Sequence, residues 1–211
     1  MASHLAGYLH GVVTTLSLAA WAGVGGCLLG IVLASWRVSP LLPLRAASQL
    51  YVDVVRNIPV ILLLLVGYFA LPGIGVSFSA FTTAVGVLAA SAAADLGEVL
   101  VAGFNSVSLG EIDAGLSLGM SYRSVLRRIV LPQAARTVAY PLSGVLVSLA
   151  KNTSIASVIA VSDLTAVAER VGASTDKPVQ AFLGAAALYA VVIAPMALML
   201  RAVASRKQIK R

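Results

Sequence analysis

Charged side chains are scarce in this chain. Lys, Arg, Asp and Glu make up 11% of the 211 residues, whereas hydrophobic residues make up 59%. An ordinary soluble domain carries about 25% charged residues. The sequence lacks the polar groups that would cover a water-facing surface, so it predicts an all-α integral membrane protein. The length suits one helical domain over residues 1–211, with no separate soluble domain.

Cysteine is almost absent as well. Cys27 is the one cysteine of the sequence and lies in an apolar run, which excludes an intrachain disulfide and favours a packing role. No cluster of metal-ligating residues surrounds it, and we expect no metal or cofactor bound by this chain. The sequence also has no glycine-rich loop ending in Gly-Lys-Ser or Gly-Lys-Thr, the motif that holds nucleotide phosphates. We therefore expect no ATP hydrolysis, and no catalytic residues, in this chain itself.

Long uncharged runs predict the membrane spans. Lipid offers no hydrogen-bond partners, so such runs must be helices of about 20 residues. The first run has no Lys or Arg before it and is too long for a signal peptide, so we expect it to be retained. Residues 104–136 are too polar for a span, and residues 162–177 are expected to form a polar loop. The predicted spans are about 11–36, 50–71, 78–103, 137–161 and 178–203.

The basic residues predict the orientation. With the N-terminus outside, the loop after the first span, residues 104–136 and the C-terminal tail are all cytoplasmic, as the positive-inside rule requires. Arg170 and Lys177 fall in an outside loop, and Lys151 lies within a span. The net charge of +7 thus reports orientation, not nucleic-acid binding. The basic residues on the cytoplasmic side are Arg37, Arg45, Arg56, Arg123, Arg127, Arg128, Arg136, Arg201, Arg206, Lys207, Lys210 and Arg211.

The polar segment 104–136 reads as two short helices with a hinge at Gly119. Pro132 is expected to set a bend before the fourth span. The second of these helices is amphipathic, and such a helix either lies in the lipid headgroup layer or docks into a groove of a partner protein. The apolar residues of the second helix recur at spacings of three and four: Tyr122, Val125, Leu126 and Ile129.

This segment resembles the "EAA" loop of ABC importer membrane subunits. That pattern is Glu-Ala-Ala, three residues, Gly, nine residues, Ile, one residue and Leu-Pro. Asp113 replaces the usual Glu and Gly115 the second Ala, which weakens the helix by about 1 kcal/mol. In the family this loop is the coupling helix that docks on the ATP-hydrolysing subunit. The corresponding residues here are Asp113, Ala114, Gly115, Gly119, Ile129, Leu131 and Pro132.

Other stretches resemble the polar amino-acid uptake branch of these permeases, and the resemblance covers about residues 8–205. Tyr51–Pro59 is similar to the Tyr-x-x-x-Phe-Arg-x-x-Pro start of a span. Pro132–Arg136 matches Pro-Gln-Ala-x-Arg, and Lys151–Ile159 is similar to the Lys-Asp/Asn-Thr-Ser-Leu run. Glu98 matches an acidic residue of the third helix, but Val101 replaces the arginine that usually follows.

The resemblance implies a type I importer permease in a bacterial plasma membrane. Its partners would be two ABC ATPase subunits that use ATP and Mg²⁺, a second permease subunit, identical or paralogous, an extracytoplasmic amino-acid-binding protein, and membrane lipid, with no nucleic acid. Transport would proceed by alternating access. Acidic or amide amino acids, of the glutamate and glutamine type, are our guess for the substrate, because Asn152 stands where an acid is often found. An importer of another solute, such as an osmolyte, and an ATP-independent secondary transporter are the alternatives.

Charged and polar residues inside the predicted spans mark a candidate substrate pathway, because charges within a bilayer usually face a cavity or a partner. One hypothesis is that Lys151 or nearby backbone N–H groups meet the amino-acid carboxylate, while Asp95 or Glu98 meets the ammonium. The alternative is a structural ion pair between Lys151 and one of these acids. Asp53 and Arg56 are expected to form a local ion pair. The pathway residues are Asp95, Glu98, Lys151, Asn152, Thr153 and Ser154.

Overall fold

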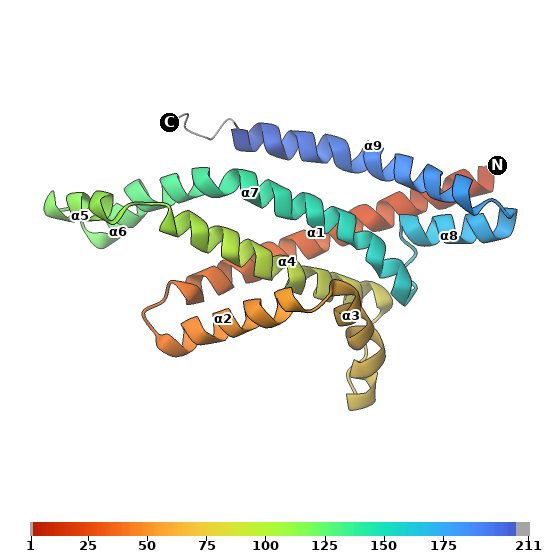
Figure 1. Ribbon diagram of the computed structural model, residues 1–211, viewed down its shortest axis with the longest axis horizontal. Helices are drawn as coiled ribbons and strands as arrows, with labels where there is room; N and C mark the ends of the chain where they lie inside the picture. The colour runs from red at the N-terminus through yellow and green to blue at the C-terminus, as the bar shows by residue number, and fades with distance from the viewer. Residues whose placement is uncertain (1, 206–211) are drawn as a thin grey trace.

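The long helices form an elongated bundle. A computed structural model of the chain describes residues 2–205, and every regular element within that range is helical (Figure 1). Helix α1 packs against α4, α4 against α7, and α7 against α9. The basic tail, with Arg206, Lys207, Lys210 and Arg211, lies outside the described residues. The long helices are α1 (Ala2–Arg37), α4 (Ala80–Asn105), α7 (Leu131–Asn152) and α9 (Pro178–Ser205).

Within residues 2–205, four helices are long and apolar enough to cross a membrane, and a fifth candidate span is bent. The prediction of about five spans therefore agrees with the fold. The predicted spans 78–103 and 178–203 lie within two residues of α4 and α9. The predicted start of the fourth span, residue 137, is wrong, because the helix that contains it already begins at Tyr122. Helix α1 begins at Ala2 rather than at residue 11, because the first residues continue the helix before the long apolar run.

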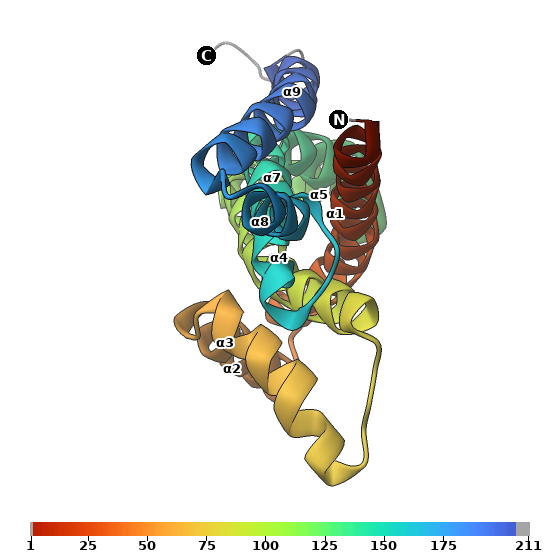
Figure 2. The same cartoon turned by 90° about the vertical axis from the view of Figure 1, so that its right-hand side faces the viewer.

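The predicted second span, 50–71, is wrong as a single helix. The structure has α2 (Leu42–Asn57) and α3 (Val60–Leu65), followed by a π turn (Val66–Ala70) and a 3-10 turn (Leu71–Ile74). The two halves of this broken span meet at 101° and lie to one side of the bundle (Figure 2). The bend follows from Pro59, which forces Ile58 out of the helical region, to φ −104° and ψ 127°.

Residues 162–177 are not the predicted loop. They contain the helix α8 (Leu164–Thr175), which packs against α1 and α9. Asp163 begins the helix, because its carboxylate accepts a hydrogen bond from the Ala166 backbone N–H at 2.9 Å. The apolar side chains of Leu164 and Val167 are buried against the neighbouring helices, and this burial stabilises a short helix that could not persist alone.

Small residues allow α1 and α4 to approach closely. A Cβ atom added at Gly26 would lie 2.9 Å from the Ala92 Cβ, and one added at Gly30 would lie 2.9 Å from the Leu96 Cβ. Such contacts stabilise helix pairs in lipid, where packing rather than the hydrophobic effect holds helices together. Cys27 is half-buried and packs beside Ala92 and its neighbours, as a packing residue would.

Candidate functional site: a coupling segment and charged residues in the bundle

The segment that resembles the EAA loop lies at one end of the bundle (Figure 1). It begins with α5 (Leu109–Ser117), whose first turn is capped by Ser108: the Ser108 hydroxyl accepts a hydrogen bond from the Glu111 backbone N–H at 3.3 Å. The helix ends at Ser117, and Gly119 follows it with a φ of +78°. Glycine adopts this left-handed conformation without steric cost, so the predicted break of the helix at Gly119 is confirmed.

The second helix of the segment does not stand alone. It starts as α6 (Tyr122–Val125), with Ser121 as its cap, and passes through a π turn (Leu126–Val130) into α7. Tyr122–Ile159 form one helix of 38 residues. The bend predicted at Pro132 is therefore wrong. The π turn directly before it is the physical reason, because a widened turn can accommodate a proline that cannot donate a backbone hydrogen bond.

Gly115 is a point of close contact between the two parts of the segment. A Cβ added there would lie 2.9 Å from the Ile129 Cδ1 and 3.1 Å from the Val125 Cγ2. The departure from alanine at this position thus coincides with tight packing. Two of the predicted coupling residues, Gly115 and Ile129, are brought together, and Val125 is buried beneath them.

The other predicted coupling residues face outward. Asp113, Ala114, Gly119, Leu131 and Pro132 are all exposed. Large apolar side chains beside them are exposed as well, an arrangement that marks a contact surface. A cavity of about 820 Å³ adjoins this surface, between the end of α1 and the segment. The exposed apolar side chains are Leu109, Leu116, Leu118, Tyr122 and Leu131.

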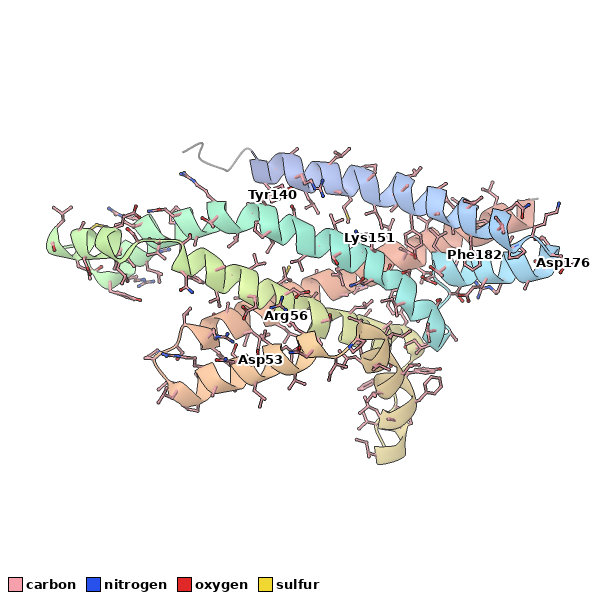
Figure 3. The ribbon with its side chains drawn as sticks, in the orientation of Figure 1. Asp53, Arg56, Tyr140, Lys151, Asp176 and Phe182 are labelled. Carbon is pink, nitrogen blue, oxygen red and sulfur yellow. The ribbon has the colours of Figure 1, made fainter. Side chains whose placement is uncertain are left out.

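The acidic residues of α4 form ion pairs that differ from the predicted ones. Asp95 pairs with Arg56 at 3.1 Å, and Glu98 pairs with Arg37 at 3.5 Å. The predicted structural pair between Lys151 and one of these acids is therefore wrong. The predicted pair of Asp53 with Arg56 is also wrong, because α2 runs back along the bundle and places Arg56 beside α4 (Figure 3).

The polar run at the end of α7 divides between two faces. Lys151 and Ser154 line a groove of about 510 Å³ toward α9, whereas Asn152 lines a small hollow that it shares with Asp95. Thr153 is fully buried, and its hydroxyl donates to the Ala150 carbonyl at 2.8 Å. The α-helix changes to a 3-10 helix (Thr153–Ile159) at this run. Lys151 and Asp95 thus do not line the same cavity.

One buried acid was not predicted as a site residue. Asp163 is fully buried, and its second carboxylate oxygen accepts a hydrogen bond from the Tyr189 hydroxyl at 3.2 Å. The Leu164 backbone N–H beside it donates to the Thr15 hydroxyl. Burial raises the pKa of Asp163, against hydrogen bonds that lower it. An aspartate before an apolar run was a capping signal in the sequence.

The described residues contain no group of three or more His, Cys, Asp or Glu side chains that could hold a metal ion. The candidate sites described above offer ion pairs, hydrogen bonds and apolar surfaces. These groups can bind and orient a polar solute or a protein partner.

Comparisons with known proteins agree with this geometry. Residues 26–209 match the family described as "Binding-protein-dependent transport system inner membrane component". The chain is 34% identical over 191 residues to the probable glutamine ABC transporter permease protein GlnM of Bacillus subtilis, covering 90% of this chain and 88% of that protein. It is 35% identical over 161 residues to the glutamate transport system permease protein GluC of Corynebacterium efficiens, covering 71% of each.

Solved structures share the fold. A chain in the "Crystal structure of an amino acid ABC transporter with histidines" superposes with a TM-score of 0.92 at 29% identity, covering 98% of this chain and 96% of that one. The MetNI methionine ABC transporter gives a TM-score of 0.74 at 17% identity, over 95% of this chain and 96% of that one, which shows the type of fold alone. The predicted importer permease fold is confirmed. This chain belongs to the family of binding-protein-dependent transport system inner membrane components.

Proposed function

We propose that this chain is one of two membrane subunits in an ATP-driven importer of polar amino acids that works by alternating access. The observation that carries the proposal is the segment 104–136, which packs on itself at Gly115 and presents exposed apolar residues at one end of the bundle. Relatives described as glutamine and glutamate permeases support the substrate class. The second permease subunit is either identical or paralogous.

The orientation in the proposal places α5 and α6 in the cytoplasm and α8 outside, in a bacterial plasma membrane. The C-terminal end of α1 and the end of α9 lie at the same end as α5 (Figure 1). Arg123, Arg127 and Arg128 are exposed there. This distribution satisfies the positive-inside rule, and an extracytoplasmic binding protein would meet the opposite end.

The coupling segment would contact the ATPase subunit. Leu118 is 83% exposed and Leu109 is 77% exposed, so both apolar side chains are available for a groove on that subunit. The ATPase, and not this chain, would bind ATP and Mg²⁺. Closure of the two ATPase subunits would favour one of two bundle arrangements, because a partner shifts a two-state equilibrium by its differential affinity for the states.

The substrate would pass along α4 and α7. Asp95 and Asn152 share a hollow between these helices, and Lys151 with Ser154 lines the groove on the other side of α7. Glu98 is held by Arg37 and Thr153 by its own helix, so we assign them supporting positions beside the path. Polar groups of this kind inside a bilayer mark solute pathways in other transporters.

Uptake by the reassembled complex tests the proposal. The permease, its ATPase and the binding protein are placed in proteoliposomes with ATP on the ATPase side, and uptake of radiolabelled glutamine, glutamate, arginine and cystine is measured. We expect ATP-dependent uptake of at least one amino acid. Uptake without ATP would indicate a secondary transporter, and uptake of an osmolyte such as glycine betaine alone would indicate another importer class. Either result contradicts the proposal.

A further inference from the structure

The ion pair between Arg56 and Asp95 lies in an unusual place. Asp95 is about 15 Å from the Asn105 end of α4, at 1.5 Å per residue. A span that ends at Asn105 therefore has Asp95 near the centre of a bilayer about 30 Å thick. Figure 3 shows Arg56 near the middle of the molecule's long axis, and not at the cytoplasmic end, where the sequence predicts it. The two side chains are nevertheless 50% and 46% exposed in this chain. A half-exposed charge pair at this depth must face a polar cavity or a partner subunit, because lipid cannot solvate it.

The surroundings of the pair are polar on one side. Ser91, Ser148 and Asn152 line the hollow next to Asp95. Its volume is about 10 Å³, which is room for about one water molecule. An amino acid therefore does not fit beside the intact ion pair. An amino acid can reach Arg56 and Asp95 only by breaking their ion pair and replacing each residue as the partner of the other.

The backbone at Arg56 adds to the electrostatic character of this place. Arg56 lies in the last turn of α2, just before the chain leaves the helix at Ile58. The last carbonyl groups of a helix have no partners within it and carry partial negative charge. A helix that ends inside a membrane thus supplies acceptors for a cationic group, as in the discontinuous helices of other transporters.

We propose that Arg56 and Asp95 bind the two charged groups that all α-amino acids share, with Arg56 on the carboxylate and Asp95 on the ammonium. In the resting state the two residues neutralise each other. When a zwitterion binds, this ion pair is replaced by two others, Arg56 with the carboxylate and Asp95 with the ammonium. The zwitterion has no net charge, so the net charge in the membrane does not change. Asn152, Ser91 and Ser148 then lie within the same hollow to hydrogen-bond the solute. The inference rests on the proposed function, because it presumes that the cargo is an amino acid.

The assignment differs from the pairing predicted for Lys151. Lys151 lines the groove toward α9, on the other face of α7 from the Asp95 hollow. Arg56 already lies 3.1 Å from Asp95, so a small separation of the two side chains lets both contact one zwitterion. Its planar guanidinium also suits a carboxylate, which it can bind through two parallel hydrogen bonds. A purely structural ion pair between α2 and α4 is the rival explanation.

Ligand binding to the permease–ATPase complex in nanodiscs, without the binding protein, separates the two explanations. Radiolabelled glutamine, glutamate, arginine and cystine are tested first. The tightest of the four is then compared with one analogue that lacks the α-carboxylate and one that lacks the α-amino group. For the wild type we expect each analogue to bind about tenfold or more weakly, as expected for loss of a hydrogen-bonded charge.

Variants of Arg56 and Asp95 show which residue binds which charged group of the amino acid. In Arg56→Gln, the analogue without the α-carboxylate should bind less than about threefold more weakly than the amino acid, while the analogue without the α-amino group still binds about tenfold more weakly. In Asp95→Asn, the effects of the two analogues should be reversed. Arg56→Lys should keep most of the carboxylate preference. Asp53→Asn is the matched control, because Asp53 is exposed and lies one turn earlier on α2. It should bind all ligands as the wild type does.

Three results would overturn the inference: no binding of any of the four amino acids to the wild-type complex, equal weakening of all ligands in both variants, or full recovery of binding in the charge-swapped double variant R56D/D95R. The last two would make the pair a structural link. ATP-dependent uptake with the binding protein, measured on the same preparation, shows separately whether the proposed function holds. Uptake without these ligand effects rejects the Arg56–Asp95 site alone.

Discussion

Residues 104–136 and 162–177 are both polar stretches between long helices, and they lie at opposite ends of the molecule (Figure 1). The first packs chiefly on itself: α5 contacts α6 and the π turn that follows, around a small cluster with Val107, Val125 and Val130 at its centre. The second, α8, packs against α1 and α9. In the first stretch α5 thus packs chiefly on the projecting start of the helix Tyr122–Ile159, whereas α8 is part of the bundle.

The helix caps reflect the same difference. The capping hydrogen bonds of Ser108 and Ser121 in the first stretch are exposed, whereas Asp163 at the start of α8 is fully buried and bonded to Tyr189 on α9. A short capped helix such as α5, held by local contacts, can transmit the binding of a partner to the long helix on which it packs. A helix whose cap is bonded to another helix keeps its place. We therefore expect changes at the first stretch to alter coupling, and changes at the second to alter stability.

The largest effect is expected from Gly115→Val. The Cβ atom would lie 2.9 Å from the Ile129 Cδ1 and 3.1 Å from the Val125 Cγ2, so the added methyl groups must displace these two side chains or move α5, at a cost of about 1–3 kcal/mol. ATP-dependent uptake in proteoliposomes should fall by about tenfold or more. Gly110→Val is the matched control on the same helix, because nothing lies within 4 Å of its added Cβ. Equal losses in both variants would refute a special role for this contact.

At the other end, Gly11→Ala should lower the stability of the complex without a specific loss of coupling. Its Cβ would lie 2.9 Å from the Leu164 Cα and 3.2 Å from the Asp163 carbonyl oxygen. These are backbone atoms, so α8 must shift, at a cost of about 1–3 kcal/mol. The thermal midpoint of the purified complex measures this cost. Gly7→Ala on the same helix meets only the Val167 Cγ1 at an ordinary 3.6 Å and should leave the midpoint unchanged; a similar fall there would argue against the contact.

A smaller effect, on the pH dependence of the protein's stability, is expected from Asp163. Burial raises its pKa above the ordinary 3.8, so the folded protein keeps this proton over a pH range in which the unfolded chain has lost it. Stability from this group is greatest below pH 3.8 and decreases as the pH rises through the raised pKa. Asp163→Asn fixes a neutral side chain and should flatten this part of the profile, as measured by thermal midpoints from about pH 4 to 7. An equally steep decrease in the variant would contradict the assignment.

Most of the helical framework could be predicted from local sequence signals. Uncharged runs located α4 and α9, and Gly119 located the end of α5. The prediction missed α8 because its polar residues outweighed the Asp163 capping signal. It also could not pair Arg56 with Asp95. That contact depends on α2 folding back along the bundle, and nothing in the spacing of 39 residues encodes the direction of a helix after a proline bend.

The smallest effect is expected where α5 meets the first turn of α7. The Gln133 side-chain amide donates to the Glu111 carboxylate at 2.6 Å, and this bond is exposed to solvent. Its loss in Gln133→Ala should cost about 0.5–1 kcal/mol, which is a two- to fivefold weaker affinity for the ATPase subunit in a titration of the purified permease. Gln133→Glu should weaken it further, because two carboxylates would then face each other across the same distance. If both variants bind the ATPase as the wild type does, this bond does not orient α5, and the Gly115 contact alone determines how the segment is held.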